Sequence, residues 1–255
     1  GQPTIEFTLT QDQKTEIMQT LKQKNIAIKT DIPKEGRPQA LLEISSQKLD
    51  EQKILKGFFG KEAVWEMTRT QDGRSYTFNN QQLIITENGF ITYFNNEEQI
   101  IWPNLTKEKA EKEARDFMNS CGGMPEGAVL DMVTYDERSE GYLLEYVRCY
   151  DDFFIENSYI TIIVTSAGVK TYYQCWLNPL KYAGKKRGVI SPLTALMRVI
   201  TEIESEDPVE ITGIRQGYYS KLYDANQWQA APVWRIQLGD SDTYYVNAYT
   251  GEMEQ

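Results

Sequence analysis

The side chains that most often carry out catalysis are scarce in this sequence. Its 255 residues include no histidine, which excludes Ser-His-Asp and Cys-His nucleophile systems and histidine-ligated zinc. Cys121, Cys149 and Cys175 have no metal-binding spacing and are interpreted as partly buried apolar residues. A bridge between Cys149 and Cys175 is the most arguable pairing and stays open. We predict that the chain is not an enzyme and holds no cofactor or metal.

Adjacent carboxylates occur at Asp151 and Asp152, between two strand-like runs. Paired carboxylates can hold a metal ion or hydrolyse a glycosidic bond. Aspartate is also a favoured turn residue, so we interpret the pair as a solvated turn. A hydrolase that uses these two residues is the weakest of the functional alternatives.

One basic cluster stands out in an acidic chain. Lys and Arg total 27 and Asp and Glu total 37, giving a formal net charge of −10, which argues against nucleic-acid binding. The cluster lacks the glycine spacing of a phosphate loop. It is either a solvated linker or a contact for an acidic partner or an anionic membrane surface. The predicted partner-binding residues are Lys181, Lys185, Lys186 and Arg187.

Tyrosine is abundant in the strand-like runs of the second half of the chain. Tyrosine-rich strands can form a binding platform, but half-buried antiparallel strands also prefer tyrosine. Both interpretations stay open for one set of residues: Tyr142, Tyr146, Tyr150, Tyr172, Tyr173, Tyr218, Tyr219, Tyr244, Tyr245 and Tyr249.

Hydrophobic periodicity and capping signals predict four helices, at residues 10–24, 46–59, 106–118 and from 191 onward. Thr10 and Gln13 have the spacing of a capping box, and Pro192 follows the expected cap Ser191. Elsewhere, alternation with a period of two predicts short strands. In one of them, Trp234 is expected to be part of the core. Residues 178–188 are expected to be a linker because of their glycines and charges.

The spacing of helices and turn glycines indicates an internal duplication. The stretch from Thr106 to Gly168 is nearly the same length as that from Ser191 to Gly251. We therefore predict an α+β fold of repeated units, each a helix packed on a small antiparallel sheet. An N-terminal α+β domain is expected over residues 1–102. A C-terminal α+β domain over 103–255 is expected to contain two such units, at about 103–178 and 189–255.

The sequence contains no run of about 18 apolar residues, so no segment of it is expected to cross a membrane. It opens Gly1-Gln2-Pro3, with neither an initiator methionine nor a signal sequence. We expect that the natural N-terminus has been trimmed, with an anchoring helix as the candidate for the missing part.

Three C-terminal segments carry a family resemblance: Gly217 to Tyr219, Ala230 to Ile236, and Tyr244 to Glu252. A Pro-x-Trp-x-Ile strand followed by Tyr-Tyr-Val-Asn-Ala and closed by Thr-Gly-Glu resembles the C-terminal half of the YycI family. It resembles the YycH family and PepSY-type modules more distantly. Farther upstream, the resemblance covers only the general organisation of helices and sheets.

The resemblance implies a regulatory protein without catalytic chemistry. YycI and YycH proteins are anchored by one N-terminal helix and lie on the extracytoplasmic face of the membrane in Gram-positive bacteria. They associate with the sensor histidine kinase of a cell-wall two-component system. A kinase of this kind, and a YycH-type protein, are the implied partners. The alternative is a free-standing PepSY-like envelope module that binds or inhibits a peptidase, or binds a cell-wall ligand.

Overall fold

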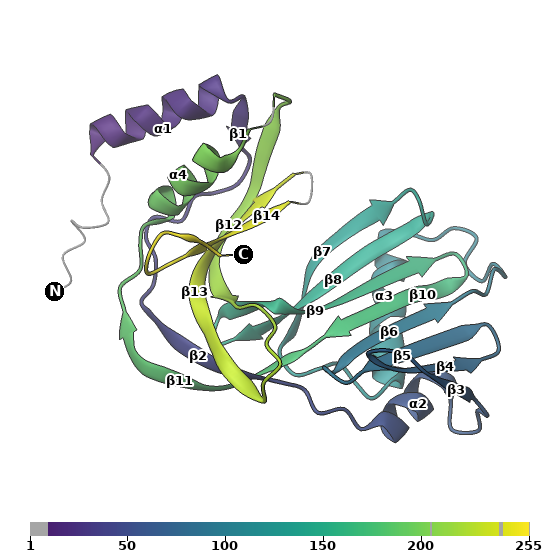
Figure 1. Ribbon diagram of the computed structural model, residues 1–255. Coiled ribbons are helices and arrows are strands. Elements are labelled where there is room, and N and C mark those ends of the chain that lie inside the picture. The colour runs from purple at the N-terminus through teal and green to yellow at the C-terminus, as the bar shows by residue number, and fades with distance from the viewer. Residues whose placement is uncertain (1–9, 205, 240–241, 255) are drawn as a thin grey trace. The chain divides into compact units, whose positions relative to one another are not determined.

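The computed structural model describes residues 10–204, 206–239 and 242–254 (Figure 1). The expectation about Gly1 to Pro3 therefore lies outside the described residues. Within the described part there are four helices and fifteen strands. The chain divides into two compact units. Unit 1 comprises Gly1–Ile44, Pro179–Tyr223 and Gln227–Gln255, and unit 2 comprises Ser45–Asn178 and Asp224–Asn226.

Unit 1 is assembled from both ends of the chain. Its strands follow the order β11-β2-β13-β12; β1 pairs in parallel with β12, and β14 pairs with β13 and β15. Helix α4 packs against β13 and β14, and α1 packs against β1 and α4. The bounds are α1 Gln11–Gln23, β1 Ile26–Ile28, β2 Gln39–Ser46, β11 Leu177–Arg187, α4 Pro192–Glu202, β12 Val209–Tyr219, β13 Gln227–Leu238, β14 Thr243–Asn247 and β15 Met253–Glu254.

The core of unit 1 is built around β13 and the buried face of α4. Trp234 is 1% exposed, and its indole Nε1 donates a hydrogen bond of 2.9 Å to the carbonyl of Ile190. This bond satisfies the indole N–H and leaves the rings free to pack on apolar neighbours. Ser191 caps α4 and Pro192 is its first residue, as predicted. The predicted core position of Trp234 is confirmed.

Unit 2 contains an antiparallel array of eight strands with two helices. Its strands follow one another as β7-β8-β9-β10-β6-β5-β4-β3. Figure 1 shows α3 behind the strands, and α3 packs against β8, β9 and β10. The bounds are α2 Glu51–Phe59, β3 Glu66–Arg69, β4 Gly73–Phe78, β5 Gln81–Thr86, β6 Phe90–Asn95, α3 Lys107–Ser120, β7 Ala128–Asp136, β8 Gly141–Tyr150, β9 Phe153–Thr165 and β10 Gly168–Cys175.

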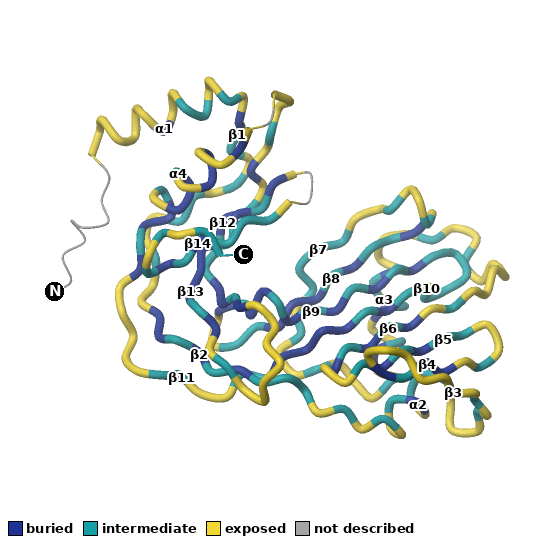
Figure 2. The backbone as a smooth tube through the Cα atoms, viewed as in Figure 1, coloured by how far each residue is buried: buried dark blue, intermediate teal, exposed yellow. Residues whose placement is uncertain are grey.

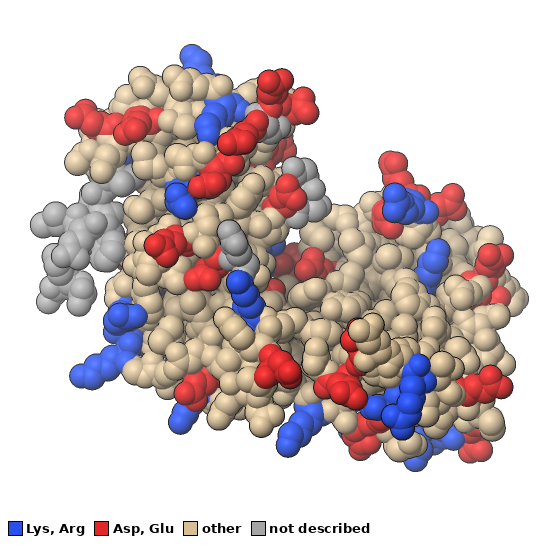
Figure 3. Space-filling view, in the orientation of Figure 1, with Lys and Arg blue, Asp and Glu red and all other residues tan. Residues whose placement is uncertain are grey.

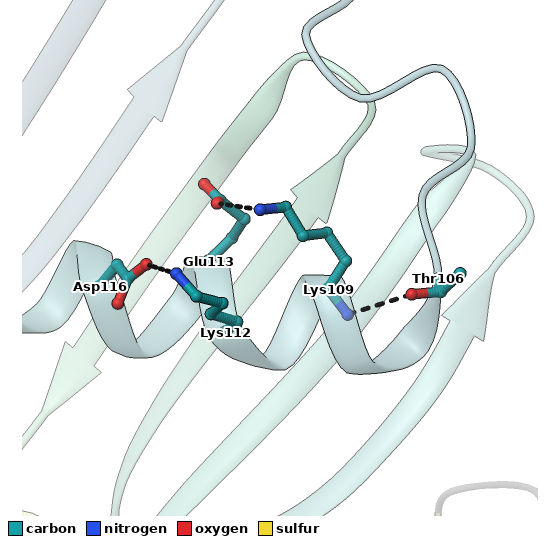
Figure 4. A network of polar contacts seen from close by, with 5 residues as sticks. All are labelled: Thr106, Lys109, Lys112, Glu113 and Asp116. Atoms are coloured by element: carbon teal, nitrogen blue, oxygen red, sulfur yellow. Dashed lines mark hydrogen bonds and ion pairs between the residues drawn. The ribbon is translucent and has the colours of Figure 1, made fainter.

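Helix α3 separates an apolar face from a charged face. Ala110, Ala114 and Met118 are buried against the sheet. The opposite face carries ion pairs at i, i+4 spacing (Figure 4): Lys109 to Glu113 at 3.3 Å and Lys112 to Asp116 at 2.7 Å. The Thr106 hydroxyl accepts a hydrogen bond of 3.1 Å from the Lys109 N–H and so begins the helix. In Figure 2, buried and intermediate colours alternate along the strands of unit 2.

The predicted fold class is wrong. The structure is dominated by a large mixed sheet of fifteen strands, and its four helices do not each cover a small sheet of their own. The expectation failed because alternation and turn glycines identify strands and hairpins but not the partners with which the strands pair. Pairings between distant segments, such as β10 with β6 and β1 with β12, extend the sheet beyond any local unit. Residues 102 and 103, where a domain boundary was expected, both lie in unit 2.

Replacing Trp234 with alanine is expected to lower the free energy of unfolding by about 3–5 kcal/mol, because the change leaves a large cavity in a closed core. Urea denaturation measures the loss. Met18, which is 71% exposed on α1, provides the control. Met18→Ala should change stability by no more than about 0.5 kcal/mol. Equal stability of Trp234→Ala and the parent would contradict the proposed core.

A small ion-pair network joins α2 to β4. Glu51 lies in the first turn of α2, and its carboxylate accepts hydrogen bonds from the Arg74 Nε at 2.6 Å and from the Tyr76 hydroxyl. Burial raises the pKa of Glu51, but the hydrogen bonds from Arg74 and Tyr76 and the Arg74 charge outweigh it. The pKa therefore lies below its ordinary value of 4.5.

This network predicts a pH-dependent contribution to stability. Because the folded pKa of Glu51 is depressed, the contribution is complete above the unfolded value near 4.5 and is lost as the pH falls through the folded pKa. Glu51→Gln should cost about 1 kcal/mol at pH 7. The difference between parent and variant should shrink below pH 4.5 in urea titrations. A difference that stays constant down to pH 3, or widens there, would refute this role.

Candidate partner-binding surfaces

The predicted basic residues lie on strand β11. Lys181, Lys185, Lys186 and Arg187 are all exposed. The segment predicted as a linker is therefore a strand hydrogen-bonded to β2. Glycine and charged side chains suggested a loop, but an edge strand tolerates both, because one of its sides faces solvent. In Figure 3, blue side chains lie along the lower left margin of unit 1, where Figure 1 places β11.

The two ends of β11 are held by specific contacts. Its first two residues, Leu177 and Asn178, belong to unit 2. There, the buried guanidinium of Arg148 donates hydrogen bonds to the carbonyl of Leu177 at 3.1 Å and to Oδ1 of Asn178 at 2.8 Å. At its end, the Arg187 guanidinium lies 4.0 Å from the centroid of the Tyr249 ring. The Tyr249 hydroxyl in turn donates to the carbonyl of Gln39 on β2. These contacts fix the backbone of the basic strand.

The cations of β11 are not equally engaged. The Lys181 Nζ lies 3.9 Å from a carboxylate oxygen of Glu43 on β2, although the lysine side chain is 75% exposed. Within the described part of the chain, Lys185 and Lys186 have no ion pair within 4.0 Å. Arg187 is partly committed to Tyr249, so Lys185 and Lys186 are the charges most available to a partner.

The tyrosines divide between core and surface roles. Tyr146, Tyr172 and Tyr218 are buried. This agrees with the interpretation that strands with one buried face prefer tyrosine. Tyr219 and Tyr245 stack with ring centroids 4.1 Å apart and an interplanar angle of 10°. Burial of the first three side chains and stacking of the last two give these five tyrosines a packing role.

Tyr173 belongs instead to the sheet surface of unit 2 that faces away from α3. On β9, Ile160, Ile162 and Val164 are buried, whereas the residues between them are half-buried. We call this second surface the open face. It is formed by Ile84, Phe90, Thr92, Phe94, Leu143, Glu145, Tyr159, Thr161, Ile163 and Tyr173.

The open face is aromatic and nearly uncharged. Tyr173 lies between Tyr159 and Phe90, with ring centroids 5.8 and 6.4 Å away. Burial, followed by the neighbouring Tyr173, raises the pKa of Tyr159 to about 12. Its hydroxyl is therefore neutral at physiological pH. Among the residues that define this face, Glu145 alone carries a charge. Such a surface suits contact with apolar and hydrogen-bonding groups rather than with ions.

Asp151 and Asp152 form the turn between β8 and β9. Both have positive φ, 49° and 66°, a conformation that aspartate tolerates better than most residues. The turn interpretation is confirmed by this geometry. Among the described residues, no group of three or more Cys, Asp or Glu side chains is placed to bind a metal ion.

Unit 2 contains a cavity of about 300 Å³ that the sequence analysis did not predict. It lies between α2 and residues 121–125, with Ile54, Phe58 and Met118 among its apolar lining residues. Burial raises the pKa of the Cys121 thiol at its wall to about 11, so this thiol stays protonated at neutral pH and is a poor nucleophile. Gly122 and Gly123 both have positive φ. The pair of glycines, followed by Pro125, is the local sequence signal for this bend.

The cysteines do not pair with one another. Cys121, Cys149 and Cys175 all lie in the described part of the chain, and none forms a disulfide. Burial raises the pKa of Cys175 to about 12, in line with its interpretation as a small apolar residue. In the described ranges, none of the helices combines the length and the apolar character that a membrane span requires.

Comparison with solved structures identifies the fold. The chain is similar to an uncharacterised protein from Eubacterium rectale ATCC 33656, with a TM-score of 0.60, 10% identity and 91% of each chain covered. It is also similar to YycH from Bacillus subtilis, with a TM-score of 0.57 and 11% identity. That match covers 91% of this chain but 61% of the YycH chain. At these identities, the similarities establish a shared fold. No curated protein matches the sequence significantly.

The model of the YycI family, described as YycI protein, matches residues 6–249 of this sequence. The chain therefore belongs to the YycI family. The predicted family is therefore confirmed. The family is one of extracellular-facing regulators of the YycG/WalK two-component system. The PepSY-like resemblance stays a prediction.

Arg187 and Lys186 are expected to differ in their effect on stability, although they are neighbours on β11. Arg187→Ala removes the contact with Tyr249 and should lower the free energy of unfolding by about 0.5–1 kcal/mol. Lys186→Ala should have a smaller effect than that, because it removes no ion pair. Thermal unfolding of both variants makes the comparison. A larger loss for Lys186→Ala would show that we have assigned the two roles wrongly.

Proposed function

We propose that this protein is a non-catalytic, membrane-anchored regulator that binds the extracytoplasmic part of the YycG/WalK sensor histidine kinase. The match to the YycI family over residues 6–249 carries this proposal. A YycH-type protein is proposed as a further partner. The anchor is proposed from the family resemblance and would hold the chain at the outer face of the membrane.

The exposed cations of β11 are the proposed contact with the kinase. Lys185 and Lys186 are held on an ordered strand without ion-pair partners in the described part of the chain. Unpaired cations on a fixed backbone can engage a partner's carboxylates without first breaking an internal contact. The open face is the second proposed contact, because it offers aromatic groups rather than charge.

Anchoring would make a weak interface sufficient. Two proteins held in the same membrane meet at a high effective concentration, so the affinity of their isolated outer domains can be low. We therefore expect weak or undetectable binding between this soluble chain and a soluble kinase sensor domain. The functional test has to use the anchored, full-length protein in cells.

The experiment is a kinase-dependent reporter in cells that carry the full-length gene, its deletion or a variant. Deletion should change the reporter output, and Lys185→Glu with Lys186→Glu should reproduce part of that change at a normal protein level. Charge reversal of two exposed lysines elsewhere in unit 1, Lys14→Glu with Lys34→Glu, is the matched control and should behave as the parent.

Two outcomes distinguish a failure of the proposed regulatory function from a failure of the proposed contact surface. An unchanged reporter after deletion of the gene would overturn the regulatory function. A response to deletion with none to the β11 variant would leave the function standing and shift the contact to the open face. Phe94→Ser would then be expected to alter the output, because Phe94 is 36% exposed on that face.

A further inference from the structure

Strand β11 ends the path of paired strands. β2 is its neighbour on one side, and no described strand pairs with the other side. An edge of this kind presents backbone N–H and C=O groups that can pair with an added strand. It spans eleven residues, and the backbone departs from the extended region at Gly184, whose φ is positive. Its ends are fixed by Arg148 and by the contact between Arg187 and Tyr249, so the edge is ordered before any partner arrives.

The charges lie on both sides of this edge. Successive residues of a strand point to opposite faces of the sheet, so Lys185 and Lys186 project on opposite faces. An extended chain added beside β11 would also place its side chains alternately on the two faces. Its carboxylates could therefore reach both lysines at once. A flat anionic membrane would approach from one side and meet only part of this charge.

Gly184 leaves the middle of the basic segment uncovered. Its φ is +79°, and a Cβ added there would meet no atom within 4 Å. The space beside Gly184, where a side chain would stand, is therefore open. The local absence of bulk permits another backbone to approach closely.

From these observations we propose that β11 accepts an extended acidic segment of a partner protein. The segment would add as a further strand along the outer edge, with carboxylates beside Lys185 and Lys186. This inference rests on the proposed function, because the partner is taken to be a protein that this chain regulates. It goes further by naming the mode of contact, which is backbone pairing, and the chemistry of the partner segment.

The opposing explanation is that the lysines only guard the edge. Charged side chains on edge strands discourage accidental pairing with other sheets. A guarding role needs repulsion between like edges and predicts no pairing with an acidic strand. The two explanations therefore differ in what the edge does when a strand of opposite charge is offered.

The test uses the whole chain and a fluorescent peptide in which glutamate alternates with threonine or valine. The peptide should bind, the binding should weaken with added salt, and Lys185→Glu with Lys186→Glu should weaken it about tenfold. The Lys14→Glu, Lys34→Glu control should bind as the parent does. The same peptide carrying N-methyl groups on alternate residues keeps its charge but cannot form a full ladder of hydrogen bonds. Its binding should be lost.

Hydrogen exchange locates the contact. Backbone amides of residues 180–187 should gain protection when the unmodified peptide is added, and amides of α1 should not. Equal binding of the N-methylated peptide, or no gain in protection on β11, would overturn the proposal in favour of a guarded edge. Binding of phosphatidylglycerol vesicles that depends on Lys185 and Lys186, with no peptide binding, would overturn it in favour of a membrane contact.

The reporter experiment distinguishes this inference from the function on which it rests. If deletion of the gene changes the kinase output but the peptide does not bind, strand addition fails and the regulatory function survives. If deletion has no effect, the function fails whatever the peptide does.

Discussion

The alternation of side chains along extended strands is the constraint on which the rest of this structure depends. Each strand offers one row of side chains to each face of its sheet. In unit 2, one row of β9 side chains, Ile160, Ile162 and Val164, packs in the core with the apolar face of α3. The other row, which includes Thr161 and Ile163, lies on the open face. In unit 1, the same alternation buries Trp234 and Ile236 beside α4. What remains for a partner is the second face and the edge.

Local features were predictable because short-range chemistry decides them. The capping box of Thr10 and Gln13, the cap at Ser191 and the burial of Trp234 all follow from neighbouring residues. Helix α2 begins at Glu51 rather than at residue 46, because residues up to 46 continue β2 and Asp50 supplies the cap. Gly168 and Gly251 take positive φ directly after their turns, so the turn signal was sound even though the expected small sheets were wrong.

The candidate surfaces were only partly predictable. The basic residues were recognisable from their charge against an acidic chain, but their place on an edge strand depends on pairing between β11 and β2, which are far apart in sequence. The open face depends on several strands in register, including the pairing of Tyr173 with Thr161 and with Thr92. No local sequence pattern shows which residues of distant strands will lie beside one another in the sheet. A tyrosine-rich strand therefore could not reveal which of its tyrosines would be buried.

Site-specific photo-crosslinking in cells tests the central claim, that β11 is the surface through which this YycI family member contacts the sensor kinase. A photoreactive residue is placed at Lys185 in the protein expressed from its complete gene, and at Lys14 on α1 as the matched position. The account predicts a covalent adduct with the kinase from position 185 and none from position 14. An adduct from α1 with none from β11, in cells where both proteins are present at normal levels, would contradict it.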